Sequence, residues 1–353
     1  MKKTIITWEV VNDHKSLKAL YSQYNAFSKN DTNLFCSGYW LTQWSLQYWH
    51  NAWQCHCYIA YDKTSLVAIA PFYIQPSQKW YEPSILRLLG QGEPEEAEIS
   101  SEYGDIQILS GYEEIVFFEL AKKIKKLKID QILCRATLTD SHLCALFKKA
   151  FNYSVKASHS RYLITRSTWS LAGLSKNTRS RYKRALNQLK NINAQFCWVA
   201  PEQYEQFVTA LTEYHQKRWQ EKGQHGAFFH KDFRAFHQTF RKNRPSTTVK
   251  ISAIVVAGKP IAINYYLVDK TTLYFYQCGW DETNYANFSL GMSLHLWSID
   301  HCEQQFYDFM MGSNNDSYKA KFGGGQVPMT NIKIDLNKGK VFLNKVFKKL
   351  GFN

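Results

Sequence analysis

A tyrosine and a lysine, Tyr318 and Lys319, stand side by side after a polar loop, and we expect them to be catalytic. The loop, residues 312–317, follows an expected strand over residues 306–311, and catalytic groups are commonly presented on loops at the ends of rigid elements. The ammonium of Lys319 can bind a phosphate or carboxylate as a point charge, or stabilise negative charge that develops on an oxygen. The alternative is an exposed loop lysine without a chemical role.

A second group of residues marks the start of a helix. Residues 289–292 open an expected helix over 290–304, directly after an expected strand over 273–279 and a polar loop. Free N–H groups at a helix start, helped by the helix dipole, bind phosphate or pyrophosphate. The alternative is that Ser289 only caps the helix. We expect an anionic ligand to be bound by the strand end and the helix start together: Cys278, Gly279, Trp280, Ser289, Leu290, Gly291 and Met292.

The expected helix over residues 175–192 is strongly basic. It carries six Lys and Arg residues and no acid. Arg181 and Arg184 are three residues apart and therefore share one face of the helix. Guanidinium groups bind phosphate through paired hydrogen bonds, so these two arginines are candidate ligands for a phosphate-bearing substrate. A solvated basic face is the alternative.

Candidates for a general base are few. A nucleophile such as an amine must lose a proton during its attack, to a side chain or through water. His215 lies one turn before Trp219 on an expected helix that begins at Pro201, and Asp105 follows a strongly acidic loop. Asp281 and Asp308 stand at the ends of expected strands. A lone histidine on an amphipathic helix is more often structural.

Several chemistries have no support in the sequence. The signatures of serine hydrolases, zinc proteases and P-loop nucleotide-binding proteins do not occur. The eight cysteines include one close group, Cys55-His56-Cys57, which lacks the second pair of ligands that a zinc site needs. We therefore expect no metal. Reduced thiols, together with an N-terminus that lacks an export signal, predict a cytoplasmic protein.

The composition is that of a folded, basic protein. The chain has 353 residues, with 44 Lys and Arg against 29 Asp and Glu, and a formal net charge of +15. Its 45% hydrophobic and 16% aromatic content excludes intrinsic disorder, and its length favours two domains. Nowhere do about 18 consecutive apolar residues occur, as a membrane-spanning helix requires. The charge favours phosphorylated or otherwise anionic ligands.

These candidate residues must be positioned by two similar sets of elements. Each half of the chain shows antiparallel strand pairs, then a helix, then another strand, which predicts a boundary near residue 165. The first half has strands over 5–11, 53–61, 66–74 and 130–136 and helices over 16–28, 112–126 and 141–151. The second half has a meander over 249–256, 261–268 and 273–279, then a helix and strands over 306–311 and 332–336.

Residues 258–323 carry several of these candidates in an order that resembles a known family. The sequence is similar to the GNAT superfamily, specifically to its FemAB-like and CelD-type N-acyltransferases. The matching residues are Gly258, Pro260, Ile261, Ala262, Asp281, Tyr285, Ser289, Gly291, Asp308, Phe309, Gly312, Tyr318, Lys319 and Phe322. The sequence departs from the family at Leu290, where the pattern has Pro. It also departs from the family's Arg/Gln-x-x-Gly-x-Gly/Ala loop, because Ala286 and Ser289 replace its first two fixed residues.

The resemblance implies an α/β fold of two tandem GNAT-like domains, with mixed, mostly antiparallel sheets flanked by helices. Residues 1–165 would be a degenerate copy and residues 166–353 the acyltransferase domain. The implied reaction is N-acyl transfer from acetyl-CoA or another acyl-CoA to a primary amine. The acceptor would be an amino sugar or amino-acid unit, for example in a cell-surface polysaccharide. The resemblance also places Tyr318 and Lys319 at the substrate cleft. Further candidates for substrate binding are Tyr103, Trp219, Asn264 and Tyr285.

Two other functions stay open. FemAB-type relatives take an amino acid from aminoacyl-tRNA, and a basic chain suits that donor. A non-catalytic protein that binds RNA or another polyanion is a different class, for which the charge is the main argument. The C-terminal stretch, residues 338–353, has an apolar face and five lysines. This pattern is typical of a terminal helix docked on its domain, or of one that contacts an anionic membrane or RNA.

Overall fold

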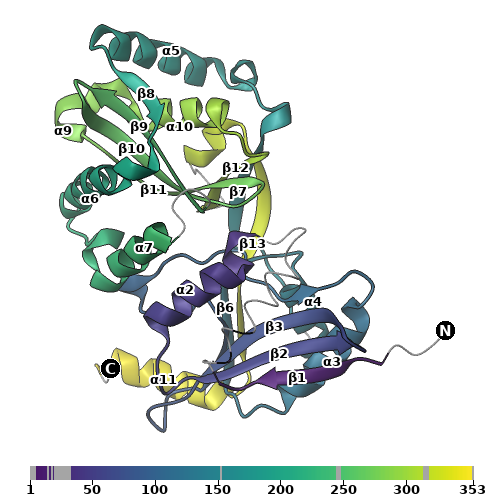
Figure 1. The fold of residues 1–353 in the computed structure, drawn as a ribbon. Coiled ribbons are helices and arrows are strands. Elements are labelled where there is room, and N and C mark those ends of the chain that lie inside the picture. The colour runs from purple at the N-terminus through teal and green to yellow at the C-terminus, as the bar shows by residue number, and fades with distance from the viewer. Residues whose placement is uncertain are drawn as a thin grey trace. The chain divides into compact units, whose positions relative to one another are not determined.

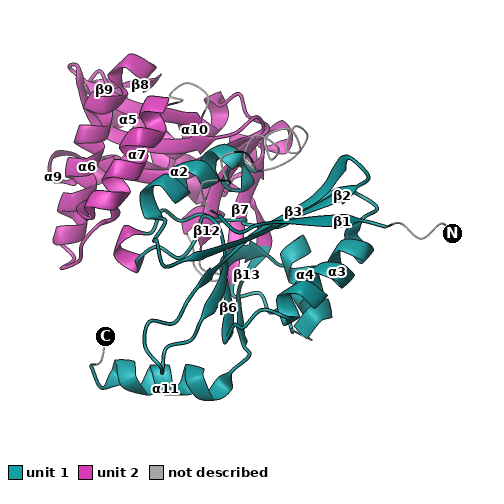
Figure 2. Ribbon diagram, turned by 60° about the horizontal axis from the view of Figure 1, so that its bottom comes forward, with its two compact units in different colours: residues 1–94, 98–158, 328–353 teal, residues 95–97, 159–327 magenta. Residues whose placement is uncertain are grey.

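The computed structural model describes residues 5–13, 16, 19, 33–151, 153–243, 248–312 and 318–351. They form two compact units, shown in different colours in Figure 2. Unit 1 comprises residues 1–94, 98–158 and 328–353, and unit 2 comprises residues 95–97 and 159–327. This division differs from the expected boundary at residue 165, because the chain leaves unit 1 after residue 158 and returns to it at residue 328. The helix expected over 16–28 lies largely outside the described residues.

The sheet of unit 1 has the strand order β1-β2-β3-β4-β6-β13 (Figure 1). Strands β1 to β4 pair antiparallel, β4 pairs parallel with β6, and β13 pairs antiparallel with β6. The short β5 pairs with β3. The bounds are β1 (Thr7–Val11), β2 (Gln54–Asp62), β3 (Ser65–Gln75), β4 (Ile85–Leu88), β5 (Gln107–Ile108), β6 (Gln131–Leu138) and β13 (Gly325–Asp335).

The sheet of unit 2 repeats this pairing pattern. Its order is β8-β9-β10-β11-β12-β7, with β8 to β11 antiparallel, β11 and β12 parallel, and β7 antiparallel to β12. The same sequence of pairings in both units confirms the expected tandem architecture with mixed, mostly antiparallel sheets. The bounds are β7 (His159–Thr165), β8 (Gln195–Trp198), β9 (Val249–Val256), β10 (Lys259–Val268), β11 (Thr272–Trp280) and β12 (Phe306–Gly312).

Helices cover both faces of each sheet. In unit 1, Phe72 packs against a ring of α4, whereas the next residue of β3, Tyr73, packs against a ring of α2. Successive strand residues point to opposite faces, so α2 and α4 lie on opposite sides of the sheet. The α-helices described in unit 1 are α2 (Gly38–Tyr48), α3 (Glu113–Lys125), α4 (His142–Phe151) and α11 (Lys338–Lys349).

The same argument places the helices of unit 2. Tyr265 of β10 contacts His237 of α7, and its neighbour Tyr266 shares a hydrogen-bond network with Ser298 of α10. Consequently β10 is buried from its second residue to its last. The α-helices are α5 (Lys176–Asn191), α6 (Tyr204–Gln220), α7 (Lys231–Asn243), α9 (Glu282–Tyr285) and α10 (Leu290–His301), with a 3-10 helix, η9 (Tyr318–Phe322). None of the helices described in either unit has the length and apolar character needed to span a membrane.

Candidate functional site

Strands β11 and β12 of unit 2 pair only at their beginnings. Their parallel register runs from Thr272–Phe306 to Tyr274–Asp308, and among the described residues it does not continue. Strand β12 stays paired with β7 but carries a bulge after Asp308. The later parts of the two strands therefore form no ladder hydrogen bonds with each other. In mixed α/β sheets such a parting of neighbouring strands is where ligands bind.

A cavity of about 420 Å³ is lined by the end of β11 and by helices on several sides of it. Helices α5 and α10 contribute their first turns, α6 contributes Arg218, and η9 contributes its ends, among them Tyr318 and Lys321. The cavity brings together eight of the residues expected from the sequence: Arg181, Cys278, Trp280, Ser289, Leu290, Gly291, Met292 and Tyr318. Ser175, Asn177, Thr178, His295 and Phe322 complete the lining.

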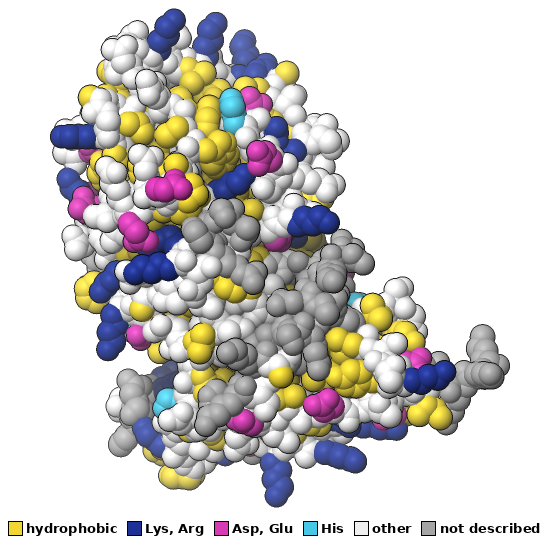
Figure 3. Space-filling view, viewed as in Figure 1, with side chains coloured by type: hydrophobic (Ala, Val, Ile, Leu, Met, Phe, Trp, Pro, Cys, Tyr) yellow, Lys and Arg dark blue, Asp and Glu magenta, His cyan; other side chains and the backbone are white. Residues whose placement is uncertain are grey.

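The cavity wall is cationic. Arg181, Arg218 and Lys321 lie on three different elements, and the lining residues that the structure describes include no carboxylate. The first turns of α5 and α10 add two helix N-termini, each with a partial positive charge. Figure 3 shows Lys and Arg side chains gathered over α5. This electrostatic environment suits an anionic ligand such as a phosphate group.

The start of α10 lacks a side-chain cap. Ser289 has the left-handed backbone conformation, with φ of 49° and ψ of 41°, and its hydroxyl makes no capping hydrogen bond. Ser175, by contrast, caps α5 by accepting a hydrogen bond of 3.2 Å from the Thr178 N–H. The alternative that Ser289 only caps its helix therefore fails. The uncapped first N–H groups of α10 are available to a ligand in the cavity.

The ring of Trp280 lies against both Arg218 and Gly291. The guanidinium carbon of Arg218 lies 4.3 Å from the centroid of the Trp280 ring, a cation–π contact that holds the arginine at the cavity wall. A Cβ atom added to Gly291 would lie 3.2 Å from an atom of the same ring. Glycine at this position therefore allows Trp280 to lie against the start of α10.

A buried chain of hydrogen bonds fixes the tautomer of His295. Asn264 donates to the Tyr266 hydroxyl at 2.9 Å, Tyr307 donates to it at 3.4 Å, and Tyr266 and Ser252 lie 3.3 Å apart. We assign the ring proton of His295 to Nδ1: with Tyr307 donating to Tyr266, the Tyr307 oxygen accepts from Nδ1, which lies 2.7 Å away. Nε2 of His295 is then unprotonated.

His295 is thus a neutral base at the cavity wall. Burial lowers its pKa to about 3, with the charge of Lys319 as a second cause. Of its two ring nitrogens, only Nδ1 has a hydrogen-bond partner among the described residues. Nε2 therefore offers a lone pair as a hydrogen-bond acceptor. The sequence pattern does not single out this histidine, because it lies inside a helix whose apolar residues indicate only burial.

Lys319 lies behind the cavity lining, at the bulge of β12. Its ammonium donates to the carbonyl oxygen of Phe309 at 2.6 Å and to that of Met311 at 2.5 Å. These carbonyls belong to the part of β12 that β11 no longer pairs, so the lysine supplies hydrogen-bond donors to the unpaired strand end. Its charge also acts on Cys278 and His295, both of which line the cavity.

Two polar side chains of the cavity lining keep their protons at neutral pH. Burial raises the pKa of the Cys278 thiol to about 11, so this cysteine is not a thiolate nucleophile. Burial also raises the pKa of the Tyr318 hydroxyl above its ordinary value. Tyr318 can therefore donate a proton or a hydrogen bond into the cavity.

His215 and Trp219 form a pair away from the cavity lining. The indole N–H of Trp219 donates to His215 Nε2 at 3.0 Å, and Nδ1 of His215 lies 3.3 Å from the side-chain oxygen of Gln216. Both ring nitrogens are therefore engaged, and burial lowers the pKa of His215. A catalytic role for this histidine and a substrate-binding role for Trp219 stay predictions.

Four further residues expected at the site have other surroundings in unit 2. A Cβ atom on Gly279 would lie 2.8 Å from the Leu211 carbonyl oxygen, so this glycine allows α6 to approach β11. Asn264 lies in the buried network, Tyr285 packs edge-on against Phe288, and Arg184 is exposed on α5. None of the four is among the residues that line the cavity.

Two expected residues, Tyr103 and Asp105, belong to unit 1. The carboxylate of Asp105 accepts from the N–H groups of His142 and Leu143 at 3.1 and 2.7 Å and so caps α4. Tyr103 is buried with φ of 58°, and its N–H donates to the Ala136 carbonyl at 2.8 Å. These contacts give both residues a structural role, and their expected roles in the reaction stay predictions.

The other two carboxylates considered as bases also have partners within unit 2. Asp281 caps α9 by accepting from the Asn284 N–H at 3.1 Å. Asp308 is fully buried, accepts from Arg161 Nε at 2.7 Å and from the Met310 N–H at 2.7 Å, and so supports the bulge. No group of three or more His, Cys, Asp or Glu side chains that could bind a metal occurs among the described residues.

The part of the chain that forms the cavity matches a family model. Residues 176–320 match the model of the acetyltransferase (GNAT) domain. These residues are a GNAT domain. This part of the chain is therefore a GNAT-type acyltransferase domain, as the sequence motifs indicated. No curated protein matches its sequence.

Solved structures show how far the GNAT fold extends. The structure of FemX has a TM-score of 0.61 at 10% identity and covers 97% of this chain and 99% of its own. A conserved protein from Bacteroides thetaiotaomicron has a TM-score of 0.53 at 11% identity, with 93% and 99% covered. The C-terminal domain of a suggested lysylphosphatidylglycerol synthetase from Agrobacterium fabrum has a TM-score of 0.51 at 10% identity, with 94% and 98% covered. At such identities the likeness concerns the fold, and it spans both units.

Proposed function

We propose that this GNAT protein transfers an acyl group from an acyl-CoA to the primary amine of an amino sugar or amino-acid unit. The observation that supports this most is the cavity of unit 2, where three cations and two helix N-termini converge without a carboxylate. A phosphate-bearing donor matches that charge. We further propose a precursor of a cell-surface polysaccharide as the acceptor and, since acyl-CoA is a cytoplasmic metabolite, a cytoplasmic location.

The residues of the cavity fit the requirements of such a donor. The uncapped first turn of α10 offers N–H groups to a phosphate, and Arg218, held on Trp280, adds a positive charge. The unpaired end of β11 provides backbone groups beside which the acyl chain can lie. No part of this arrangement requires a metal.

The reaction needs one proton removed and one supplied. The amine nitrogen bonds to the thioester carbonyl carbon, the C–S bond breaks, the amine loses a proton and the leaving sulfur gains one. His295 Nε2, which we take as unprotonated, accepts a hydrogen bond from the amine and passes its proton on to water, since a pKa of about 3 does not let the ring hold it. Tyr318, whose hydroxyl stays protonated, supplies a proton to the sulfur. Lys319 keeps the end of β12 in place beside them and contributes positive charge.

Two arginines on α5 provide a matched test of the donor site. Arg181 lines the cavity, whereas Arg184, one turn further along and also exposed, does not. Arg181→Ala should weaken coenzyme A binding, measured by calorimetry, at least about tenfold, or about 1.4 kcal/mol. Arg184→Ala should leave it unchanged. Equal affinity for coenzyme A in both variants and the wild type would contradict this assignment of the cavity.

A second candidate is an aminoacyl-tRNA-dependent transferase. It is favoured by basic residues of α5 that lie outside the cavity lining, among them Lys183, Arg184 and Lys190. A compact donor bound in the cavity would not contact them. A long polyanion would contact them and would bind with a strong dependence on salt. If aminoacyl-tRNA binds, coenzyme A does not, and Arg184→Ala weakens binding as much as Arg181→Ala, this second function replaces the first.

A further inference from the structure

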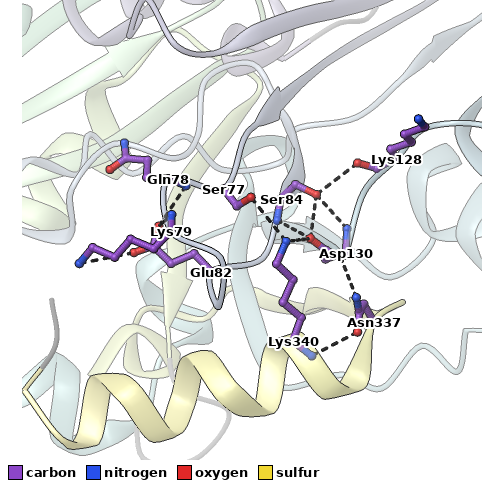
Figure 4. Close-up of polar contacts among 9 residues, drawn as sticks. All are labelled: Ser77, Gln78, Lys79, Glu82, Ser84, Lys128, Asp130, Asn337 and Lys340. Atoms are coloured by element: carbon purple, nitrogen blue, oxygen red, sulfur yellow. Dashed lines mark hydrogen bonds and ion pairs between the residues drawn. The ribbon is translucent and has the colours of Figure 1, made fainter.

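The C-terminal helix α11 is docked on unit 1 along one side only. Val341 is buried, and the Phe347 ring stacks on that of Tyr81 at a centroid distance of 4.3 Å. Lys340 donates to the Asp130 carboxylate at 3.0 Å (Figure 4). These contacts hold the helix against the loop that precedes β4.

Asp130 fixes the orientation of α11. Besides Lys340, its carboxylate accepts from the backbone N–H and the hydroxyl of Ser84 at 2.9 and 3.0 Å and from the side chain of Asn337 at 3.0 Å. Asn337 in turn caps the helix by accepting from the Lys340 N–H at 3.1 Å. Figure 4 shows these bonds converging from three segments of the chain. The outward face of α11 is therefore presented in a fixed direction.

That outward face carries apolar side chains. Phe342 is 65% exposed and Leu350 is 66% exposed, and they lie eight residues apart with Val346 between them. This spacing places the three on one stripe of the helix. Leu343 adjoins the stripe, and Trp80, which is 71% exposed, packs edge-on against Phe347 at 5.6 Å. We call these five residues, Trp80, Phe342, Leu343, Val346 and Leu350, the α11 ridge.

Lysines accompany the ridge. Lys338, Lys345, Lys348 and Lys349 are all exposed, and the helix from residue 338 to residue 349 contains no acid. By the helical repeat, Lys338, Lys345 and Lys349 fall on one edge of the apolar stripe. Lys340, the fifth lysine, is engaged with Asp130 on the docked side. The outward side of α11 is thus an amphipathic surface, apolar along one stripe and positively charged beside it.

We propose that the α11 ridge and its lysines bind the surface of a membrane that contains anionic lipids. An exposed tryptophan, an apolar stripe and adjacent lysines are the combination that lies at the boundary between lipid headgroups and acyl chains. RNA would use the lysines but not the ridge, and a second copy of this face would bring two rows of lysines together. The inference rests on unit 1 and is independent of the proposed reaction.

Vesicle binding tests the proposal directly. In flotation at about 0.1 M salt, the protein should bind vesicles of phosphatidylcholine with a quarter phosphatidylglycerol and not vesicles of phosphatidylcholine alone. Phe342→Ser with Leu350→Ser should reduce binding at least tenfold, and so should Lys345→Gln, Lys348→Gln and Lys349→Gln together. The single variant Leu350→Ser, near the end of the helix, should give an intermediate loss of vesicle binding. It keeps the test valid if the double variant does not fold.

Matched changes elsewhere on unit 1 serve as controls. Leu46 and Phe118 are exposed apolar residues, and Lys125, Lys126 and Lys128 are exposed lysines on or just after α3. Leu46→Ser with Phe118→Ser, and the three lysines changed to Gln, should leave vesicle binding within twofold. Absence of binding to anionic vesicles, equal losses in test and control variants, or losses only in the lysine variant together with RNA binding would each overturn the proposal. So would dimerisation that the ridge variant abolishes without vesicles.

Discussion

Lys319, which we propose acts in the reaction, also has a backbone role that the sequence does not reveal. Its ammonium is held by two carbonyl oxygens of the β12 bulge. We expect Lys319→Met to lower the turnover number about a hundredfold, the usual scale for the loss of one electrostatic donor, with the Michaelis constant for the acceptor nearly unchanged. Steady-state kinetics checks this.

Because Lys319→Met also removes two hydrogen-bond donors, its melting temperature should fall by several degrees. Assays are therefore run well below that temperature. Lys319→Arg should restore little of the turnover, since the planar guanidinium is wider than an ammonium. Wild-type turnover in folded Lys319→Met would remove this residue from the reaction.

The two nitrogens of His295 can be tested separately. The amide of Asn can approximate the position of Nδ1, and the amide of Gln can approximate that of Nε2. If Nε2 accepts the proton of the amine, His295→Asn should lose at least about a hundredfold in turnover. His295→Gln should retain more activity, although it loses the bond to Tyr307. If the Asn variant is the more active of the two at equal stability, Nε2 has no role.

Among single residues, those that belong to a sequence motif could be predicted from the sequence. Ser289, Gly291 and Tyr318 belong to ordered motifs, and all three line the cavity. Arg218 and His295 belong to no motif, because each is a single polar residue on a helix and only tertiary packing brings it to the cavity. A partial signal existed for Arg218, because it lies one helical turn after His215, which was an expected site residue. Nothing in the local sequence distinguishes His295 from a structural histidine.

At the scale of elements, the start of α10 makes a testable difference between capping and ligand binding. Ser289 has the left-handed conformation, which glycine adopts at no steric cost, and its hydroxyl makes no cap. Ser289→Gly should therefore leave coenzyme A binding within about twofold and raise stability by up to about 1 kcal/mol. Calorimetry and thermal unfolding measure the two effects. A loss of stability of about 1 kcal/mol or more would indicate a capping role after all.

Elements with strong local signals were predicted closely. The hairpin of β2 and β3 and the meander of β9 to β11 follow from alternating apolar residues and polar turns. Two strands were harder to assign. No strand was expected where β7 lies, and only the last part of β13 was predicted. Both follow one unit in the chain and pair in the other, with β12 and β6 respectively. Such an exchange depends on tertiary pairing, which no local pattern encodes.

For the whole molecule, acid should destabilise unit 2 more than unit 1. Burial lowers the pKa of His215, His237 and His295 in unit 2. Below pH 6.5 the unfolded chain binds protons that folded unit 2 does not, so stability falls by about 1.4 kcal/mol per pH unit for each such histidine. In unit 1, burial raises the pKa of Asp105 to about 6. Folded unit 1 then binds that proton before the unfolded chain does, which stabilises it as the pH falls from about 6 towards 4. This offsets the destabilisation from His56 of unit 1, whose pKa burial lowers.

Hydrogen exchange followed by mass spectrometry resolves the two responses. After correction for intrinsic exchange rates, peptides from residues 159–327 should lose protection between pH 7 and pH 5 more than peptides from residues 33–151. His237→Gln should reduce the loss in unit 2 by about a third, because one of three histidines is removed. Equal changes in the two units would show that these buried groups do not control the response to acid.

The return of residues 328–335 to the sheet of unit 1 has a consequence for synthesis on the ribosome. Unit 2 is translated almost entirely as one run, residues 159–327, before the strand that pairs with β6 exists. At about 5–20 residues per second, β6 waits on the order of 10–40 s with an unpaired edge. The N-terminal unit, which begins first, is therefore the last to complete its sheet. During that interval the nascent chain exposes a template for wrong strand pairing, and a chaperone that covers strand edges would find its target there.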